Sequence, residues 1–393
     1  MKPEFDQPVK RRGSFCYKWD CDQMQDDVIP MWVADMDFRV AEPIVNALRR
    51  RVEHGVFGYT KVPEEYYRSV INWFGRRHGW KIEREWIQYT TGVVPAISAV
   101  IKALTNPGDK VLVQTPVYNC FFSSIRNDEC ELLRAPLVYA NNTYTVDFAE
   151  FERVTAENHP KVFLLCNPHN PSGRVWTKDE LRKMGEICLK YGVAVVDDEI
   201  HCELVMPGHE FHSFASISPE MQDICITLNS PSKSFNIAGL QMANIICNNA
   251  GIRERIDHIL NVYEICDVNA FAPHAVMAAY NESEEWIDAL NEYIFGNYSA
   301  LVDFIKEEMP HLSVCKLEGT YLAWVNISAT GVDADTLAAK ILEQGRVLVN
   351  SGLMYSAGGE EGRDFIRLNL SCPRAQMMEA LHRIAGVINN IKD

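Results

Sequence analysis

The sequence predicts an α/β protein with a mostly parallel central sheet covered by helices, and a smaller α+β domain beside it. Two observations lead to this prediction. Short, nearly continuous apolar runs recur in the middle of the chain, and amphipathic helical patterns separate them. The pattern changes after about residue 285, where one long helical stretch is followed by isolated strands. A chain of 393 residues is long enough for one large and one small domain.

The predicted strands of the sheet are apolar throughout, which is typical of parallel strands buried on both faces. They cover residues 110–114, 161–166, 193–197, 224–228 and 243–247. Helix start signals lie between them. Thr177 with Glu180 forms a capping box, and Asp147 with Glu150 offers a second start.

Three parts of the chain are expected to divide the fold. Residues 1–45 are predicted to join the small domain, 46–285 to form the large domain and 286–393 to form the small C-terminal domain. The last part carries a long helical pattern, two short strands and a final helix, at about 286–305, 322–326, 365–369 and 374–391.

Composition narrows the class of function. A net charge of −15 argues against unassisted binding to nucleic acid or to an anionic membrane surface. No apolar run approaches the roughly 20 residues of a membrane span, and the first residues lack the apolar core of a signal peptide. The twelve cysteines form no Cys-x-x-Cys motif, so we expect reduced thiols, a cytoplasmic protein and no metal site; Cys16 and Cys21 lack a second pair at zinc spacing.

Lys233 lies in the run Ser230-Pro231-Ser232-Lys233-Ser234, and Asp198 lies upstream at the end of an apolar strand. An amine flanked by hydroxyl groups and paired with a carboxylate is what a pyridoxal phosphate enzyme needs. The lysine forms a Schiff base with the aldehyde, the serines donate to the phosphate, and the aspartate holds a proton on the pyridine nitrogen.

Four polar or aromatic residues follow predicted strands at the ends where ligands bind in open α/β sheets. Tyr118 follows 110–114, Asn170 follows 161–166, and Asp198 and Lys233 follow the next two strands. We therefore expect them on one rim of the sheet. The segment 90–97 predicts a helix that begins near Gly92, and a helix N-terminus suits a phosphate, although an ordinary capped helix has the same pattern.

Taken together, these motifs resemble those of fold-type I pyridoxal phosphate enzymes of the aminotransferase class I/II family, over essentially the whole chain. Within that family the chain is most similar to the cystathionine β-lyase-like, or C–S lyase, subgroup. The residues that carry this closer resemblance are the segments 31–38, 56–60, 198–201 and 365–370. The resemblance implies pyridoxal 5'-phosphate as cofactor and a homodimer with shared active sites.

The resemblance also assigns roles at the cofactor ring. Lys233 is the Schiff-base lysine and the acid/base at the substrate Cα, and Asp198 pairs with the pyridinium nitrogen. Asp197 cannot replace Asp198, because adjacent strand side chains point to opposite faces; the choice between the two follows from the resemblance. Asn170 and His201 are expected to bond the phenolic oxygen, and Tyr118 to stack on the ring.

Further roles concern the phosphate and the substrate. The backbone amides of Val93 and Val94, together with Ser230 and Ser232, are expected to hold the phosphate, and Tyr59 to reach the phosphate of the neighbouring subunit. For the substrate, Arg367 is expected to clamp the α-carboxylate, with Ala34 close by. Tyr321 either lines this pocket or is a core aromatic residue. Gln241 departs from the pattern, since many aminotransferases have a phosphate-binding arginine there.

The activity implied by the resemblance is α,β-elimination of cystathionine- or cysteine-type substrates to pyruvate, ammonia and a thiol or hydrogen sulfide. An aminotransferase using the same pocket is the first alternative, because the two reactions diverge only after a shared carbanion. A regulator with the same fold, acting through a protein partner, is the second. The preferred sulfur amino acid stays open in the sequence.

Overall fold

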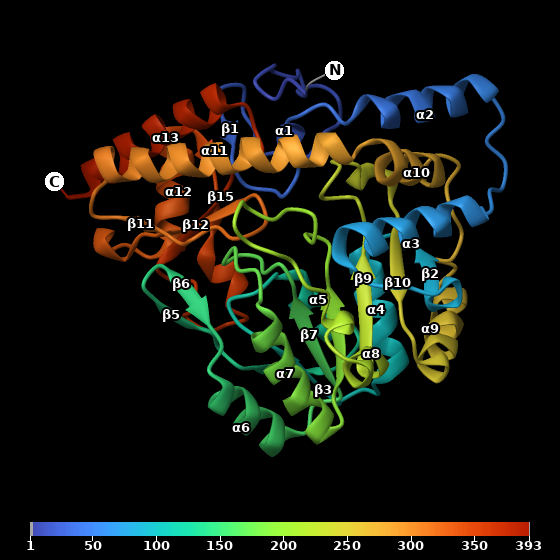
Figure 1. The fold of residues 1–393 in the computed structure, drawn as a ribbon. Coiled ribbons are helices and arrows are strands. Elements are labelled where there is room, and N and C mark those ends of the chain that lie inside the picture. The colour runs from blue at the N-terminus through green and yellow to red at the C-terminus, as the bar shows by residue number, and fades with distance from the viewer. Residues whose placement is uncertain (1–2, 393) are drawn as a thin grey trace.

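The computed structural model describes residues 3–392. Its centre is a seven-stranded sheet in the order β2-β10-β9-β8-β7-β3-β4 (Figure 1). Only β10 runs against its neighbours, and the other strand pairs of the sheet are parallel. The strands are β2 (Ile87–Thr90), β3 (Lys110–Val113), β4 (Glu131–Arg134), β7 (Val162–Cys166), β8 (Ala194–Asp198), β9 (Cys225–Asn229) and β10 (Ala243–Ile246). The predicted mostly parallel sheet is confirmed.

Helices cover both faces of this sheet, which explains why its strands are apolar throughout (Figure 1). In β7, Val162 and Leu164 pack into the core beneath one set of helices, and Phe163 and Leu165 pack into the core on the opposite face. The first set is α4 (Val93–Leu104), α5 (Cys120–Asn127) and α9 (Ala250–Val262). The second includes α6 (Phe148–Asn158), α7 (Lys178–Tyr191) and α8 (Pro219–Ile224).

Both predicted helix starts are present. Thr177 and Glu180 form the complete capping box ahead of α7, and the Asp147 side chain accepts a hydrogen bond from the Glu150 amide ahead of α6. Each bond satisfies an amide that lacks a partner within its helix.

The remaining α-helices lie outside these two sets, and a second, smaller sheet follows α11 in the chain. They are α1 (Tyr17–Asp20), α2 (Glu42–His54), α3 (Glu64–His78), α10 (Ala272–Glu282), α11 (Glu284–Glu308), α12 (Ala334–Gly345) and α13 (Arg374–Asn389). The smaller sheet has the order β11-β12-β15-β14, with β11 (Ser313–Val314), β12 (Leu322–Asn326), β14 (Asn350–Ser351) and β15 (Phe365–Asn369). A separate hairpin joins β5 (Val138–Ala140) and β6 (Thr143–Thr145).

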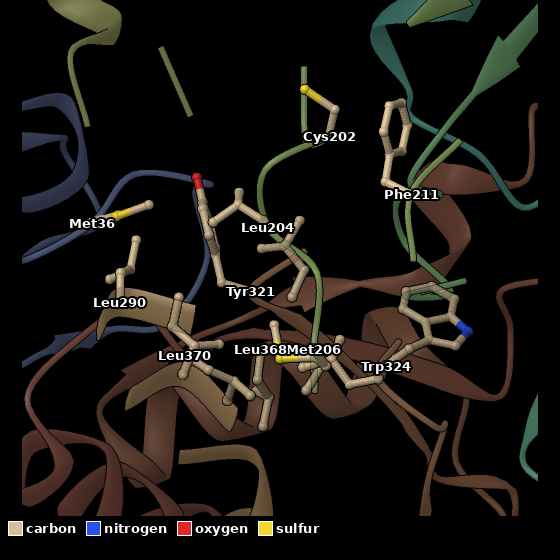
Figure 2. Packing of buried hydrophobic residues seen from close by; sticks show 14 of the residues in the cluster. Met36, Cys202, Leu204, Met206, Phe211, Leu290, Tyr321, Trp324, Leu368 and Leu370 are labelled. Carbon is tan, nitrogen blue, oxygen red and sulfur yellow. The ribbon is translucent and has the colours of Figure 1, made fainter. Parts of the chain in front are cut away.

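The N-terminal segment packs with the C-terminal part of the chain. Strand β1 (Ile29–Pro30) pairs in parallel with β13 (Val347–Leu348), and the Asn369 side chain donates to the carbonyls of Val33 and Asp35. In the segment 201–211, Val205 forms an isolated antiparallel bridge with Gly319, which precedes β12. Figure 2 shows Leu204 and Met206 of this segment packed among side chains of the smaller sheet and of α11. Within residues 3–392, no helix is both long and apolar enough to cross a membrane.

Candidate active site

A cavity of about 480 Å³ opens where the carboxyl ends of the large sheet meet the smaller sheet and the N-terminal segment. Ten residues predicted for the site line it: Ala34, Val93, Val94, Tyr118, Asn170, Asp198, His201, Ser232, Lys233 and Arg367. Three other predicted residues, Ser230, Tyr321 and Tyr59, lie outside its lining. The strand-end argument therefore located the cavity, because parallel strands deliver the residues that follow them to one edge.

Lys233 is half-buried in the turn that follows β9. Its Nζ donates a hydrogen bond to the Ala34 carbonyl oxygen at 2.6 Å. Burial lowers the pKa of the Lys233 ammonium, and the positive charge of Arg367 adds to this effect. A lowered pKa enlarges the fraction of neutral amine, which is the form that acts as a nucleophile or a base.

Asp198 is the last residue of β8 and is 3% exposed. Its Oδ1 accepts a hydrogen bond from the Ile200 amide at 3.1 Å. Burial raises the pKa of Asp198 to about 7. Asp197 points to the opposite face, where it accepts from the Phe214 amide at 3.2 Å, as the strand alternation predicts. A buried carboxyl group with a raised pKa that lines a cavity is a candidate functional group.

His201 lines the same cavity as Asp198, and Tyr321 packs against His201 from outside the lining. The Nδ1 atom of His201 is buried and has no hydrogen-bond partner in the described part of the chain. Tyr321 packs edge-on against it, with ring centroids 5.8 Å apart, and is itself fully buried outside the cavity lining. Of the two interpretations of Tyr321, this position favours a supporting core residue. The unpartnered His201 nitrogen indicates that the site holds a polar group.

Arg367 lies in the middle of β15 and is 4% exposed. Its Nη1 donates to Asn170 Oδ1 and its Nη2 to the Trp32 carbonyl, both at 2.9 Å. The Nε atom is buried without a partner in the described residues. The guanidinium is thus held in one orientation with donor capacity to spare, which suits a carboxylate. Arg374, by contrast, begins α13 and donates to Asn297 Oδ1 at 3.0 Å.

The start of α4 forms another part of the cavity. Gly92 precedes the helix without a side-chain cap, so the first amides of α4, including those of Val93 and Val94, have no partner within the helix. Ser232 lines the same cavity, whereas the Ser230 hydroxyl is buried beneath it, 2.6 Å from the Ser232 hydroxyl and 2.6 Å from the Met242 carbonyl. Free helix amides beside a serine hydroxyl form a donor set for an anion.

Gln241 contributes nothing to this donor set, because it is exposed and lies outside the cavity lining. Many aminotransferases have an arginine at this position. Because this chain has Gln241 there, the described residues that line the cavity include no arginine beside α4. Tyr59 is fully exposed and belongs to no part of the cavity in its own chain.

Several lining residues carried no signal of their own in the sequence. Tyr17, Asn350 and Tyr355 reach the cavity through tertiary contacts. Tyr17 packs against Trp32 with ring centroids 5.2 Å apart, and the Tyr355 ring lies 5.0 Å from the Arg367 guanidinium carbon. Trp32 lies within the segment 31–38, which resembles the C–S lyases, and this resemblance is the one sequence feature that could have indicated Trp32 as a site residue.

The family model described as aminotransferase class I and II matches residues 26–384. The chain belongs to this family, and the predicted membership is confirmed. It is 40% identical over 388 residues to a protein of Bacillus subtilis (strain 168) named cystathionine beta-lyase PatB, covering 98% of this chain and 100% of that one. The predicted similarity to the C–S lyase subgroup is confirmed as well.

Solved structures agree with this grouping. Cystalysin from Treponema denticola, whose crystal structure contains a pyridoxal 5'-phosphate cofactor, is 34% identical with a TM-score of 0.96, covering 99% of this chain and 100% of that one. The PLP-bound C-S lyase from Staphylococcus hominis is 30% identical with a TM-score of 0.92, covering 99% and 98%. The predicted fold type is confirmed by these two neighbours.

Proposed function

We propose that this protein is a pyridoxal phosphate-dependent carbon–sulfur lyase. It would convert cystathionine- or cysteine-type substrates by α,β-elimination to pyruvate, ammonia and a thiol or hydrogen sulfide. One observation carries the proposal. An amine, a buried carboxyl group and a clamped guanidinium, those of Lys233, Asp198 and Arg367, line one cavity in a chain that is 40% identical over its length to a cystathionine β-lyase.

The donors and acceptors of the cavity fit pyridoxal 5'-phosphate. Lys233 would carry it covalently, and Asp198 would face the pyridine nitrogen. The unpartnered Nδ1 of His201, together with Asn170, would bond the phenolic oxygen, and Tyr118 would lie against the ring. When bound, the protonated ring stabilises the electron pair that remains at the substrate Cα.

The phosphate would lie at the start of α4. The amides of Val93 and Val94 and the Ser232 hydroxyl are directly available there, and Ser230 supports Ser232 from beneath. Gln241 stands where many aminotransferases have a phosphate-binding arginine. The neutral donors and the helix dipole would therefore bind the phosphate, together with Tyr59 of the partner subunit.

The residues of the chain would share the steps of the reaction. Arg367 binds the substrate α-carboxylate through its planar fork, beside the Ala34 carbonyl that now accepts from Lys233. The Lys233 Nζ, as a neutral amine, takes the proton from Cα. The sulfur then leaves Cβ as a thiolate, and the three-carbon product hydrolyses to pyruvate and ammonia.

Pyruvate release tests this proposal. The enzyme supplied with cystathionine should release pyruvate without an added keto acid. Lys233→Ala should abolish the release because Lys233 is the only lysine among the described residues that line the cavity. Lys316→Ala, at an exposed position outside the cavity, is the matched control and should leave the rate unchanged. Product formation that requires a keto acid would make the aminotransferase alternative correct.

A regulator without catalysis is the remaining alternative. It predicts that Lys233→Ala keeps the biological effect of the gene although pyruvate release is lost. Retention of that effect would contradict a purely enzymatic role.

The active unit is further proposed to be a homodimer with shared sites. Val56, Phe57 and Tyr59 are exposed on one segment, and Tyr59 lies outside the cavity lining of its own chain. Lys233→Ala and Tyr59→Ala variants should each be impaired, and mixed dimers should regain activity because one of their two sites is intact. A monomer in sedimentation experiments would contradict the proposal.

Three finer points belong to the same proposal. A place in sulfur amino acid metabolism follows from the proposed substrates, and a cytoplasmic location is supported by the twelve cysteines, all of which are free. The division into residues 1–45, 46–285 and 286–393 is supported by the pairing of β1 with β13, which joins the N-terminal segment to the C-terminal part.

A further inference from the structure

A second cavity, of about 330 Å³, adjoins the proposed active site. It lies between α5 and the segment 352–358, and both Asn119 and Met354 line the two cavities together. Its other lining residues come from the same two parts of the chain and are Phe122, Ser123, Arg126, Leu353, Ala357 and Gly358. The shared residues make the second cavity a continuation of the first.

The active-site cavity does not by itself accommodate every charge of the proposed substrates. Cystathionine carries a carboxylate at each end, and Arg367 is proposed to bind the one at the reacting end. Arg367 and Lys233 are the only arginine and lysine among the described residues that line this cavity, and Lys233 is proposed to hold the cofactor. Burial lowers the pKa of His201 to about 3, so its ring is neutral. A carboxylate at the far end of a substrate therefore has no cationic partner in this cavity.

We propose that Arg126 binds the distal carboxylate of the substrate in the second cavity. This assignment rests on the proposed lyase function and selects, among its substrates, thioethers that end in a carboxylate, as cystathionine does. Arg126 is exposed, and its guanidinium makes no hydrogen bond or ion pair with the described residues. A free guanidinium fork binds a carboxylate through two parallel hydrogen bonds.

The position of Arg126 on α5 directs it toward the active site. Asn119, Ser123 and Arg126 follow one another at intervals of four and three residues, which places them on one face of the helix, and Asn119 already has helical dihedral angles. Side chains on a helix lean toward its N-terminus, which here is the end at the active site. Seven residues of helix span about 10 Å, a distance that the extended tail of cystathionine and the arginine side chain cover between them.

The other groups of the second cavity suit the rest of such a tail. The Asn119 side chain makes no hydrogen bond with the described residues, so its amide oxygen can accept from the distal ammonium. Ser123 Oγ donates to the Cys120 carbonyl at 3.0 Å, which leaves its lone pairs able to accept. Leu353 and Met354 offer apolar surface to the methylene groups. No carboxylate is present among the described residues that line this cavity, so none competes for Arg126.

Pyruvate release from three thioethers of equal chain length tests the assignment in the cofactor-loaded enzyme. The substrates are cystathionine, S-carboxypropylcysteine, which keeps only the distal carboxylate, and S-butylcysteine, which has no distal charge. Arg126→Gln should raise the KM for the first two about fivefold or more, the size expected of an accessible ion pair, and leave the KM for S-butylcysteine unchanged. The kcat should stay the same for all three, because Arg126 does not touch the reacting atoms.

Arg68→Gln is the matched control, because Arg68 is exposed on α3 and lines neither cavity. It should leave all three KM values unchanged. Arg126→Glu reverses the charge in the second cavity and should lower the KM for S-aminopropylcysteine, whose distal group is an ammonium. A KM change that is equal for charged and uncharged tails, or no change for the two carboxylate tails, would overturn the assignment.

A binding measurement separates this inference from the proposed function. The thioether that has both carboxylates of cystathionine and neither amine cannot react with the cofactor. In calorimetric titration its Kd should be about fivefold or more higher for Arg126→Gln than for the wild type, whereas a methyl group in place of the distal carboxylate should abolish the difference. If no substrate yields pyruvate but this Kd shifts, the lyase function is wrong and the carboxylate site stands. If the Kd does not shift, the carboxylate site is wrong, whatever the lyase assay shows.

Discussion

Asp37 is the acceptor at the centre of a buried ionic cluster that holds the N-terminal segment in place. Its carboxylate is 2% exposed and accepts from four side chains: Lys18 Nζ at 2.9 Å, Arg11 Nη1 at 2.7 Å, Trp19 Nε1 at 2.8 Å and Gln376 Nε2 at 3.1 Å. We predict that Asp37→Asn, which keeps the shape and removes the charge, strongly destabilises the protein.

The magnitude follows from what the substitution leaves behind. Lys18 is fully buried, and its other acceptor is the Asp35 carbonyl at 2.9 Å. An asparagine at position 37 would turn an amide NH₂ toward donors, and the Lys18 ammonium would be buried without a counter-charge. Breaking a buried ion pair in this way costs about 3–5 kcal/mol. Lys18→Met should cost less, because Asp37 would keep its three other donors.

Urea unfolding at neutral pH and fixed protein concentration measures this loss. Burial alone would raise the pKa of Asp37, but Lys18 and the donated hydrogen bonds bring it below the usual value, so its contribution is complete above about pH 4 and is lost only in more acidic solution. Asp35→Asn is the control. Asp35 pairs with Arg11 at a partly exposed position and should contribute about 0–1 kcal/mol.

The reasoning would be refuted by an Asp37→Asn protein within about 1 kcal/mol of the wild type. It would also be refuted if Asp35→Asn were equally damaging, because burial of the charge would then not be the cause. The segment held by this cluster carries Trp32 and Ala34 into the proposed active site, so the variant should also bind cofactor more weakly.

Three further changes have defined outcomes. In the cofactor-free protein, burial raises the pKa of Asp198 to about 7, so between about pH 4 and 7 the folded state keeps a proton that the unfolded state has lost. As the pH rises through this range, the free energy of unfolding of the wild type should therefore fall by up to about 4 kcal/mol relative to that of Asp198→Asn. Urea unfolding measures this difference. Thr177→Ala removes the cap on the Glu180 amide and should cost about 1 kcal/mol, seen as a lower melting temperature. Arg367→Lys replaces a planar fork by a point charge, and the KM for cystathionine should rise about tenfold or more in the pyruvate assay.

Each of these outcomes has a clear opposite. A pH profile of Asp198→Asn parallel to that of the wild type would show that Asp198 is not the group that titrates. An unchanged melting temperature of Thr177→Ala would mean that water replaces the cap at no cost. An unchanged KM of Arg367→Lys would remove Arg367 from substrate binding.

The local patterns of the sequence were sufficient for much of the fold. The strand predicted over 161–166 is β7, and the capping box at Thr177 begins α7 as expected. These elements could be predicted because burial on both faces and helix capping leave a mark within a few neighbouring residues. The reversed direction of β10 leaves no such mark, since an apolar strand has the same composition in either direction.

The candidate site divides along the same line. Asn170, Asp198 and Lys233 could be placed on one rim because each follows a strand, and strand ends are local features. Tyr17 and Asn350 reach the same cavity from opposite ends of the chain, through contacts that no short pattern encodes. The Ser230 hydroxyl donates a hydrogen bond to the Met242 carbonyl, which lies just before β10. This contact could not be predicted either, because it forms only when β10 packs beside β9.

The residues alone therefore settled which chemical groups this protein has and the kind of sheet that presents them, because residue type and period are written along the chain. Distances between groups far apart in sequence were decided only when the two sheets packed together. His78 and Glu203 illustrate the difference: 125 positions separate them in the chain, and folding brings their side chains to 2.7 Å.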